Sequence, residues 1–336
     1  MNKGAIAEFH RRLHGWYGEH GRKDLPWRKT QDAYAIYVSE IMLQQTQVKT
    51  VLERYYFQFL ERFPTLAHLA AASRDEVLSA WQGLGYYNRA LHLHEAAKRC
   101  GGALPQTAGE LHALPGVGRN TAHAVAAFAF REKVAVMEAN VRRVLSRIFA
   151  LSAPDEAQLW DKAQLLLDRA APFDYNQAMM DIGALICTRR APLCPQCPAN
   201  SICRGQETPE SYPAAKAKKA PPVRRKRIAV PRNAQGLYYA VPRSSRFLQG
   251  LYHFIETEGD SEHFLFRATP YPFAQARLLG HIRQQYSHFT LEAEVYLAEA
   301  PFPGGNAWYS LEQLALLPMS MAERKIMQFL QEPIIL

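Results

Sequence analysis

The sequence contains little cysteine, and most of it is gathered in one place. Of 5 cysteines in 336 residues, four lie between Cys187 and Cys203. The first twenty or so residues lack an apolar core followed by a small-residue cleavage site, so we expect no secretory signal. No apolar run is long enough to span a bilayer, so we expect no membrane partner. These absences indicate a cytoplasmic protein, nucleoid-associated if bacterial, in which clustered cysteines serve metal or redox chemistry.

Acidic residues are fewer than basic residues. The chain carries 40 Lys and Arg against 31 Asp and Glu, for a formal charge of +9. A basic surface suits a polyanionic partner, and nucleic acid is the leading candidate. Charge alone does not separate this interpretation from simple solubility.

Residues up to about 208 have mostly helical patterns. Residues 32–63 carry apolar side chains at helical spacing without an internal proline or glycine. Ser73, with Glu76 three residues later, predicts a capping box at the start of another helix. Further helical patterns cover residues 119–130, 139–151 and 174–188.

The second half of the chain has a different composition. Residues 209–227 hold seven Lys or Arg and a single acid, Glu210, together with several prolines and alanines, so they predict an extended basic linker. Residues 228–336 contain short aromatic or β-branched runs between turn residues, and a helical pattern near their end. They predict a separate strand-rich domain. No internal repeat is found.

The four clustered cysteines are spaced C-x6-C-x2-C-x5-C, at Cys187, Cys194, Cys197 and Cys203. Structural zinc usually takes its ligands from two close pairs, and only one such pair is present here. One continuous loop of this length can also surround an iron–sulfur cluster. The coordination rules leave both metals open. Arg189, Arg190 and Arg204 flank the cysteines and suit contact with phosphate.

A glycine-rich segment, "LPGVGR", precedes the helical pattern that begins at Arg119. Gly116 and Gly118 allow a tight turn and a close approach to a ligand. The following helix start offers free N–H groups to an anion. The segment therefore predicts a helix-hairpin-helix that holds a DNA phosphate without reading a base.

Two glutamates lie in or beside helical patterns of the first part of the chain. Glu40 lies in the apolar helical segment "YVSEIMLQQ", where burial would raise its pKa and keep it protonated. Glu138 precedes another helical pattern, in "EANVRRV". Two carboxyls whose surroundings separate their pKa values can act as an acid and as a negative charge in one site.

These segments together resemble the MutY-type adenine DNA glycosylases of the endonuclease III superfamily. The resemblance rests on "LPWR", "VSEIMLQQTQV", "WQGLGYYNRA", "LPGVGR", "NQAMMDIGALICT" and the cysteine spacing, and it covers most of the first 205 residues. It implies a multidomain fold, with an all-α helix-hairpin-helix domain over 1–208 and a Nudix-like α+β domain over 228–336. Within 1–208, it implies a six-helix part at 25–132 and an iron–sulfur part made of 1–24 and 133–208, and it favours a [4Fe–4S] cluster over zinc.

The resemblance also implies roles for particular residues. It implies that Glu40 is the general acid toward adenine N7, that Glu138 faces the sugar, and that Asn140 places Glu138 or the attacking water. It assigns Arg28, Gln177 and Leu43 to an adenine pocket. The residues that it implies contact DNA or the lesion are Gln45, Thr46, Leu84, Tyr86, Gly116, Gly118, Arg142, Tyr286, Ser287 and His288.

The sequence departs from the family pattern at Glu138-Ala139, at Asn120 and at Tyr286. The family has Asp-Gly where this chain has Glu138-Ala139, and an aspartate is one methylene shorter. Bifunctional relatives carry a lysine where this chain has Asn120, so base removal without strand cleavage is expected. Tyr286-Ser287-His288 resembles the family's Phe-Ser-His loop, which recognises 8-oxoguanine. The run of glutamates that binds magnesium in Nudix hydrolases is absent.

The resemblance therefore predicts a monomeric, monofunctional enzyme that removes adenine mispaired with 8-oxoguanine or guanine in double-stranded DNA. Two alternatives stay open. One is a slowed or inactive lesion-binding protein, disabled by Glu138. The other is a mismatch glycosylase for another base, such as thymine opposite guanine.

Overall fold

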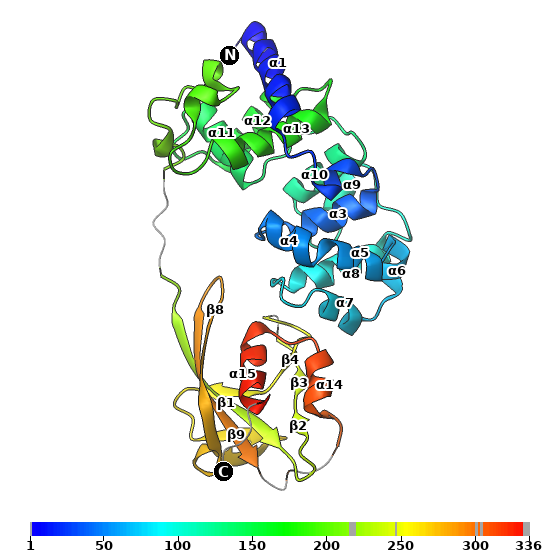
Figure 1. Cartoon of the computed structure of the whole chain (residues 1–336), viewed down its shortest axis with the longest axis vertical. Coiled ribbons are helices and arrows are strands. Elements are labelled where there is room, and N and C mark those ends of the chain that lie inside the picture. Colours follow the sequence, from blue (N-terminus) through cyan, green and yellow to red (C-terminus); the bar gives the residue numbers. More distant parts are fainter. Residues whose placement is uncertain (1, 215–219, 246, 300–301, 303–304, 332–336) are drawn as a thin grey trace. The chain divides into compact units, whose positions relative to one another are not determined.

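The computed structural model describes residues 2–214, 220–245, 247–299, 302 and 305–331. The chain forms two compact units (Figure 1): residues 1–71 with 95–217, and residues 72–94 with 218–336. Residues 72–94 thus group with the C-terminal residues, although the sequence places them within the predicted helical domain. Residues 215–219 of the predicted linker lie outside the described residues.

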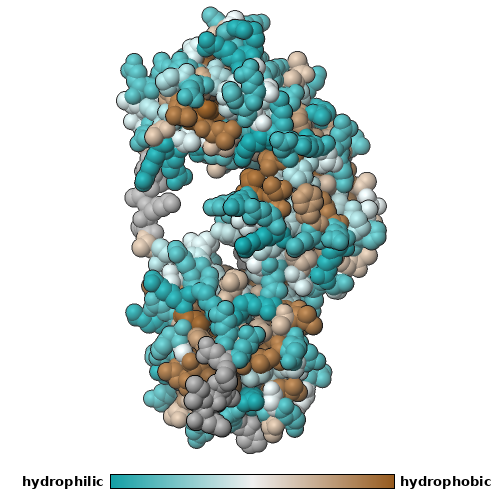
Figure 2. Space-filling view, in the orientation of Figure 1, coloured by the Kyte–Doolittle hydropathy of each residue, from teal (hydrophilic) through white to brown (hydrophobic). Residues whose placement is uncertain are grey.

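Polar side chains cover most of the visible face of each unit, with smaller separate apolar patches (Figure 2). Among the described residues, no helix combines the length and apolar character needed to cross a membrane.

The first unit is built from helices. They are α1 (Lys3–His20), α2 (Pro26–Lys29), α3 (Ala33–Met42), α4 (Val48–Arg54), α5 (Tyr56–Arg62), α6 (Leu66–Ala71), α9 (Ala108–His112), α10 (Arg119–Ala129), α11 (Ala139–Ile148), α12 (Glu156–Leu166) and α13 (Pro172–Asp181). Helix α8 (Asn88–Arg99) crosses from one unit into the other.

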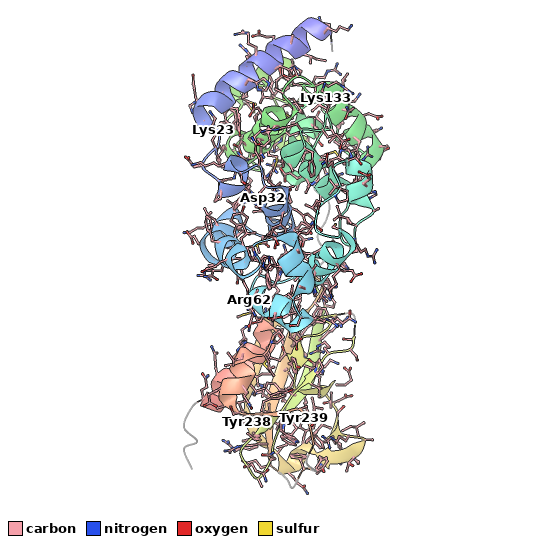
Figure 3. The ribbon with its side chains drawn as sticks, turned by 90° about the vertical axis from the view of Figure 1, so that its right-hand side faces the viewer. Lys23, Asp32, Arg62, Lys133, Tyr238 and Tyr239 are labelled. Carbon is pink, nitrogen blue, oxygen red and sulfur yellow. The ribbon has the colours of Figure 1, made fainter. Side chains whose placement is uncertain are left out.

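The long helical pattern over 32–63 is interrupted twice in the structure. Asp32 caps α3 by accepting a hydrogen bond from the Tyr34 amide at 2.9 Å, and Arg62 ends α5; both are labelled in Figure 3. Between them the helix breaks after Met42, where Gln45 adopts a left-handed backbone with φ of 56°. No proline or glycine marks this break, so spacing alone predicted more continuous helix than exists.

Two apolar clusters hold the first unit together. The larger joins α1 to α11, α12 and α13 through fully buried residues such as Phe9, Leu13 and Leu145. The smaller packs Ile36 of α3 against Ala124 and Phe128 of α10. These clusters fix α3, α10, α11 and α13, which carry most of the predicted catalytic residues.

The C-terminal end of α13 leads directly into the cysteine loop. The helix continues as a π-helical turn, Ile182–Ile186, which ends at Cys187. Three short 3-10 turns follow at Cys194–Gln196, Asn200–Ile202 and Pro209–Ser211. The predicted helix over 174–188 is confirmed, and the wider π turn is an addition that spacing did not reveal.

The second unit is α+β, in agreement with the predicted Nudix-like class. Its main sheet has the order β10-β2-β1-β9-β8, and β5 also pairs with β1. The strands are β1 (Val223–Arg232), β2 (Tyr238–Tyr239), β3 (Val241–Pro242), β4 (Tyr252–His253), β5 (Ile255–Glu258), β6 (His263–Phe266), β7 (Thr269–Pro272), β8 (Arg277–Gln285), β9 (Thr290–Glu299) and β10 (Trp308–Tyr309). The helices are α7 (Arg74–Ala80), α14 (Leu311–Leu316) and α15 (Met321–Gln331).

Strand β1 begins earlier than the composition predicts. Residues 223–227, assigned to the linker from their charge, are the first half of this strand and pair in parallel with β9 from Val223 to Arg232. Pairing with a neighbouring strand, rather than local propensity, orders these basic residues. The predicted capping box of α7 is confirmed, since Ser73 and Glu76 each accept a hydrogen bond from the other's backbone amide.

Candidate active site

Glu40 lies near the end of α3, and its carboxyl is enclosed although part of the residue reaches the surface. Its helix neighbours Ser39 and Ile41 are buried. Burial is the main cause that raises the pKa of Glu40 to about 7; the charge of Glu138 adds to the rise, and Arg28 opposes it. In a large fraction of molecules the Glu40 carboxyl is therefore protonated at neutral pH, as a proton donor requires.

Glu138 immediately precedes α11 and is half-buried. Its Oε1 is buried and has no hydrogen-bond partner among the residues that the structure describes. Burial raises the pKa of Glu138, while the nearby amides of Asn140 and Val141 and the Arg143 cation lower it. The charge of either carboxyl opposes ionisation of the other, so the two groups do not lose their protons together.

Asn140 is held from two sides. Its Oδ1 accepts a hydrogen bond from Arg143 Nη2 at 2.9 Å, and the same nitrogen donates to the Gly183 carbonyl at 2.6 Å. A β-carbon at Gly183 would lie 2.5 Å from the Asn140 β-carbon, so only glycine fits there. The π-helical turn after α13 is therefore packed tightly against the start of α11.

Arg28 is bound by a fully buried carboxylate. Asp181, whose side chain is 0% exposed, accepts hydrogen bonds from Arg28 Nη1 at 2.7 Å and Nη2 at 2.9 Å. It also accepts from the Arg22 amide at 2.8 Å and from Arg22 Nε at 2.7 Å. Burial opposes ionisation of Asp181, but these hydrogen bonds outweigh it and lower its pKa. Asp181 thus fixes the guanidinium that lies close to Glu40.

The predicted adenine pocket contains unpaired polar atoms. Gln177 lies one turn before Asp181 on α13 and is 3% exposed. Within the described part of the chain, Gln177 Oε1 and Arg28 Nε are buried without hydrogen-bond partners. Native proteins rarely leave such groups unpaired, so an acceptor and a donor here suit a polar ligand. Leu43, the residue after α3, is half-buried.

The glycine segment forms the predicted hairpin between α9 and α10. Gly116 has φ of 72°, a conformation that favours glycine. Gly118 precedes α10, and a β-carbon there would meet no described atom within 4 Å. The start of α10 is therefore open to an anion.

Asn120 is hydrogen-bonded to the segment that leads to Glu138. Its Oδ1 accepts a hydrogen bond from the Met137 amide at 2.8 Å, and Met137 directly precedes Glu138. Asn120 therefore anchors the backbone beside Glu138. Bifunctional relatives carry a lysine at this position.

The predicted DNA contacts of the first unit lie at its surface. Gln45 is exposed and Thr46 is half-buried, with its hydroxyl 3.3 Å from the Gln44 carbonyl. Arg142 is half-buried and forms a 3.3 Å ion pair with Glu156. An exposed side chain on a left-handed, non-glycine residue, as at Gln45, is uncommon and is often found at functional sites.

Leu84 and Tyr86 belong to the second unit. Tyr86 is 44% exposed and also has a left-handed backbone, with φ of 50°. The guanidinium of Arg89 lies over the Tyr86 ring, 5.3 Å from its centre. Leu84, in contrast, is buried. Its contact with the opposite base stays a prediction.

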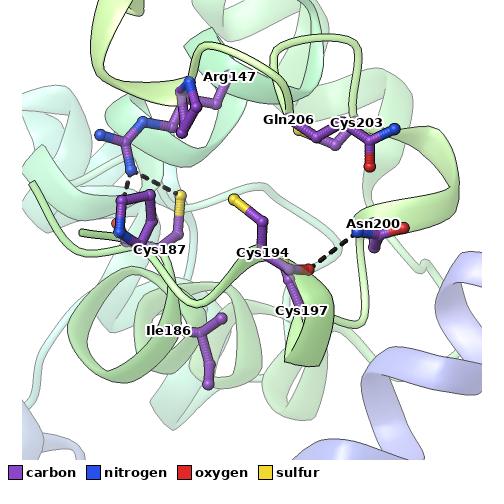
Figure 4. Close-up of a pocket in the computed structure, with 10 residues that line it drawn as sticks. Arg147, Ile186, Cys187, Cys194, Cys197, Asn200, Cys203 and Gln206 are labelled. Carbon is purple, nitrogen blue, oxygen red and sulfur yellow. Dashed lines mark hydrogen bonds between the residues drawn. The ribbon is translucent and has the colours of Figure 1, made fainter. Parts of the chain in front are cut away.

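The four cysteines of the loop surround one space. All four are free and, together with Arg147 and Asn200, line a cavity of about 20 Å³ (Figure 4). Burial raises the pKa of Cys197 to about 12 and also raises the pKa values of Cys194 and Cys203. In the described ranges, no three His, Cys, Asp or Glu side chains are arranged to hold a single metal ion.

Arg147 ties this loop to α11. It is 2% exposed, and its Nη1 donates to Cys187 Sγ at 3.3 Å and to the Thr188 carbonyl at 2.6 Å. One turn earlier on the same helix, Arg143 Nε donates to the Cys187 carbonyl at 2.9 Å. The helix that begins beside Glu138 therefore holds the first cysteine through two arginines.

The turn at Tyr286, Ser287 and His288 joins β8 to β9. Ser287 and His288 are exposed, with Ser287 Oγ and His288 Nδ1 3.2 Å apart. Tyr286 is half-buried, with its ring centre 5.1 Å from that of Phe247. Burial raises the pKa of Tyr286 to about 12, and the charge of Glu323 adds to the rise. The Tyr286 ring therefore packs against its aromatic neighbours.

Comparison with known proteins identifies the class of the chain. Residues 38–167 match the family described as "HhH-GPD superfamily base excision DNA repair protein". A thermostable thymine-DNA glycosylase of known structure is 30% identical, with a TM-score of 0.56, over 61% of this chain and 97% of that chain. An endonuclease III–DNA complex, 21% identical over 62% of this chain and 97% of that chain, shares the fold with a TM-score of 0.53. The chain belongs to the HhH-GPD superfamily of base excision DNA repair proteins.

Adenine DNA glycosylases are more similar in sequence. Those of Rattus norvegicus and Homo sapiens are 46% identical over 220 residues and 45% identical over 223 residues, or 60% and 61% of this chain. The alignments span only 42% and 40% of the lengths of these relatives. The predicted resemblance to MutY-type proteins is thus confirmed.

Several site residues were missed at the sequence level. Asp181 interrupts the apolar run "AMMDIGALI", and a buried acid requires a cation, so its position gave a usable signal. Arg143, Arg147 and Gly183 gave none, because their roles depend on contacts between segments about 40 residues apart in the sequence.

Proposed function

We propose that this protein is a monofunctional DNA glycosylase that removes adenine mispaired with 8-oxoguanine or guanine. The observation that carries the proposal is the pair of enclosed carboxyls, Glu40 and Glu138, close enough that the charge of one raises the pKa of the other. Such a pair, with unequal pKa values, supplies the proton donor and the anion that glycosidic cleavage requires.

In the proposed reaction, Glu40 donates its proton to N7 of the extruded adenine. The bond between N9 and C1′ breaks, and its electron pair stays on the base. The sugar becomes an oxocarbenium ion that the Glu138 carboxylate stabilises. Water then adds to C1′ and transfers its proton to Glu138, so adenine leaves and an abasic site remains.

The base is held by the polar atoms that lack protein partners. Gln177 Oε1 is an acceptor for the exocyclic amine of adenine, and the Arg28 guanidinium donates to a ring nitrogen. Asp181 keeps Arg28 in place through two hydrogen bonds. Leu43 supplies an apolar contact for the ring.

Strand cleavage is not part of the proposed reaction. A glycosylase that also cuts the strand needs an amine to form a Schiff base. Asn120 offers an amide, and its oxygen is occupied by the Met137 amide.

The proposed DNA contacts come from both units. The hairpin at Gly116 and Gly118 holds a phosphate, and Gln45 and Tyr86 enter the duplex where the adenine has left. Ser287 and His288 read the 8-oxoguanine. We propose that a monomer performs all of these steps.

The cysteine loop is proposed to hold a [4Fe–4S] cluster through Cys187, Cys194, Cys197 and Cys203. Four thiols around one cavity suit a sulfur-ligated cluster. When bound, the cluster would cross-link the loop and so present its arginines to phosphate.

Purified protein is expected to be brown and to contain about four irons and four sulfides per chain. Cys194→Ser should lower the iron content, because it removes one thiolate ligand, whereas Cys100→Ser should leave it unchanged. Iron and sulfide analysis checks this expectation. Colourless, zinc-containing protein would contradict it.

The rate of base release should depend on the protonation of Glu40. The acid form predominates below a pKa of about 7, so the rate should fall as the pH rises through about 7. Single-turnover rates measured between about pH 5 and about pH 9 test the direction. A rate that rises across this range would show that Glu40 does not act as the acid.

The function is tested by single-turnover assays on duplexes with one defined mispair. Release of adenine opposite 8-oxoguanine, with strand scission only after alkali, is the expected result. Tight binding without release would favour the lesion-binding alternative. Because the thymine-DNA glycosylase is 30% identical, a duplex with thymine opposite guanine belongs in the same assay. Preferential release of thymine would overturn the adenine assignment.

A further inference from the structure

The start of β1 lies beside the turn that joins β8 to β9. The Thr290 amide donates to the Pro222 carbonyl at 2.9 Å, just before β1 begins. The turn itself is closed by a 2.8 Å hydrogen bond from the Tyr286 amide to the Phe289 carbonyl. Arg224, the second residue of β1, pairs with Leu291, three residues after His288 in the chain.

The Arg224 side chain is stacked on an aromatic platform. Its guanidinium carbon lies 4.4 Å from the centre of the Phe289 ring, well within the range of a cation–π interaction. Phe289 is buried and contacts the rings of Phe247, Tyr286 and His288 at 5.3, 4.9 and 4.8 Å. This platform is fixed, so a guanidinium resting on it loses little further freedom when it binds a ligand.

Arg224 differs from the basic residues around it because its charge is not neutralised. Arg225, Lys226, Arg227 and Arg232 pair with Glu292, Glu258, Glu294 and Glu299 at 3.8, 2.6, 2.9 and 2.9 Å. Arg224 is exposed and has no carboxylate partner among the described residues. It is thus a preoriented, uncompensated cation beside the proposed reading turn.

We propose that Arg224 binds a backbone phosphate of the DNA strand that carries the 8-oxoguanine, adjacent to the base that Ser287 and His288 read. This inference rests on the proposed function and adds a binding residue to it. The guanidinium presents its N–H donors in a plane that matches phosphate oxygens, while Phe289 covers one face. A phosphate contact carries no sequence information, so Arg224 positions the strand and leaves recognition to the turn.

The test compares Arg224→Ala with Arg225→Ala, a neighbouring exposed arginine on the same strand that is paired with Glu292. Binding of the full-length protein to a duplex with adenine opposite 8-oxoguanine is measured by fluorescence anisotropy at several salt concentrations. Arg224→Ala should weaken binding about threefold to tenfold and reduce the slope of log affinity against log salt by about 1. Arg225→Ala should change the slope much less. The Arg224→Lys variant should keep the salt slope, because it keeps the charge. It should bind DNA more weakly than wild type, because it lacks the planar guanidinium that stacks on Phe289.

An unchanged slope in Arg224→Ala, with the protein folded by circular dichroism, would overturn the inference. So would an equal reduction in both alanine variants, because the effect would then reflect net charge alone. Failure of the proposed function has a different signature, since wild-type protein would then release no adenine whatever the effect of Arg224 on binding.

Discussion

Glu40→Gln is expected to lower the single-turnover rate of adenine release by about a hundredfold to ten thousandfold, while duplex affinity stays near that of wild type. Glutamine has the shape of glutamic acid but cannot transfer a proton to N7. It also removes the group whose pKa is raised to about 7, so the residual rate should lose its dependence on pH in this range. Base release on a defined oligonucleotide and anisotropy on the same duplex measure the two effects separately.

The matched control is Glu61→Gln, an exposed glutamate on α5. It makes the same chemical change at an exposed side chain outside the predicted site and should leave the rate unaltered. If Glu40→Gln releases adenine as fast as this control, Glu40 is not the proton donor.

Glu138→Gln is expected to lower the rate by about a hundredfold to a thousandfold, because it removes the charge that stabilises the cationic sugar. The Oε1 atom of Glu138 has no hydrogen-bond partner within the described residues, so the amide should fit without disturbing α11. Loss of this negative charge should also lower the pKa of Glu40 and move the fall in the residual rate toward lower pH.

Glu138→Asp tests how the longer side chain is accommodated. Ala139 is the first residue of α11 and does not have the left-handed backbone that would require the family's glycine. Aspartate on this backbone would hold its carboxylate short of the sugar, and a misplacement of about 1 Å can cost about a hundredfold in rate. Combining Glu138→Asp with Ala139→Gly, which restores the family's pair of residues, should recover part of that loss.

The opposite order of activities would have a different meaning. If the wild-type protein is inactive and the Glu138→Asp variant is active, Glu138 disables the enzyme. The protein would then be a lesion binder, and binding assays would report its function.

The sequence predicted the residues whose chemistry is unusual for their surroundings. Glu40 is an acid inside an apolar helical pattern, and four thiols lie within one short stretch. Both can be recognised without knowing the fold, because burial and metal binding constrain residue types locally. The all-α and α+β character of the two halves also followed from spacing. The roles assigned to these residues stay predictions until the assays above are done.

The features that the sequence did not reveal depend on contacts between distant segments. Arg143 and Arg147 resemble any basic helix face until the carbonyl of Cys187 is placed beside them. The left-handed backbone at Gln45 has no glycine to mark it. Strand β1 begins within a run of charge that is typical of a linker, because its order comes from pairing with β9.

The hydrogen bond from the Met137 amide to Asn120 has a consequence for how new reaction types evolve in this scaffold. A lysine at position 120 would supply the nucleophile of a strand-cutting enzyme, but it would also withdraw the acceptor that fixes the residue before Glu138. Asn120→Lys would therefore add an amine and remove this backbone anchor in a single step.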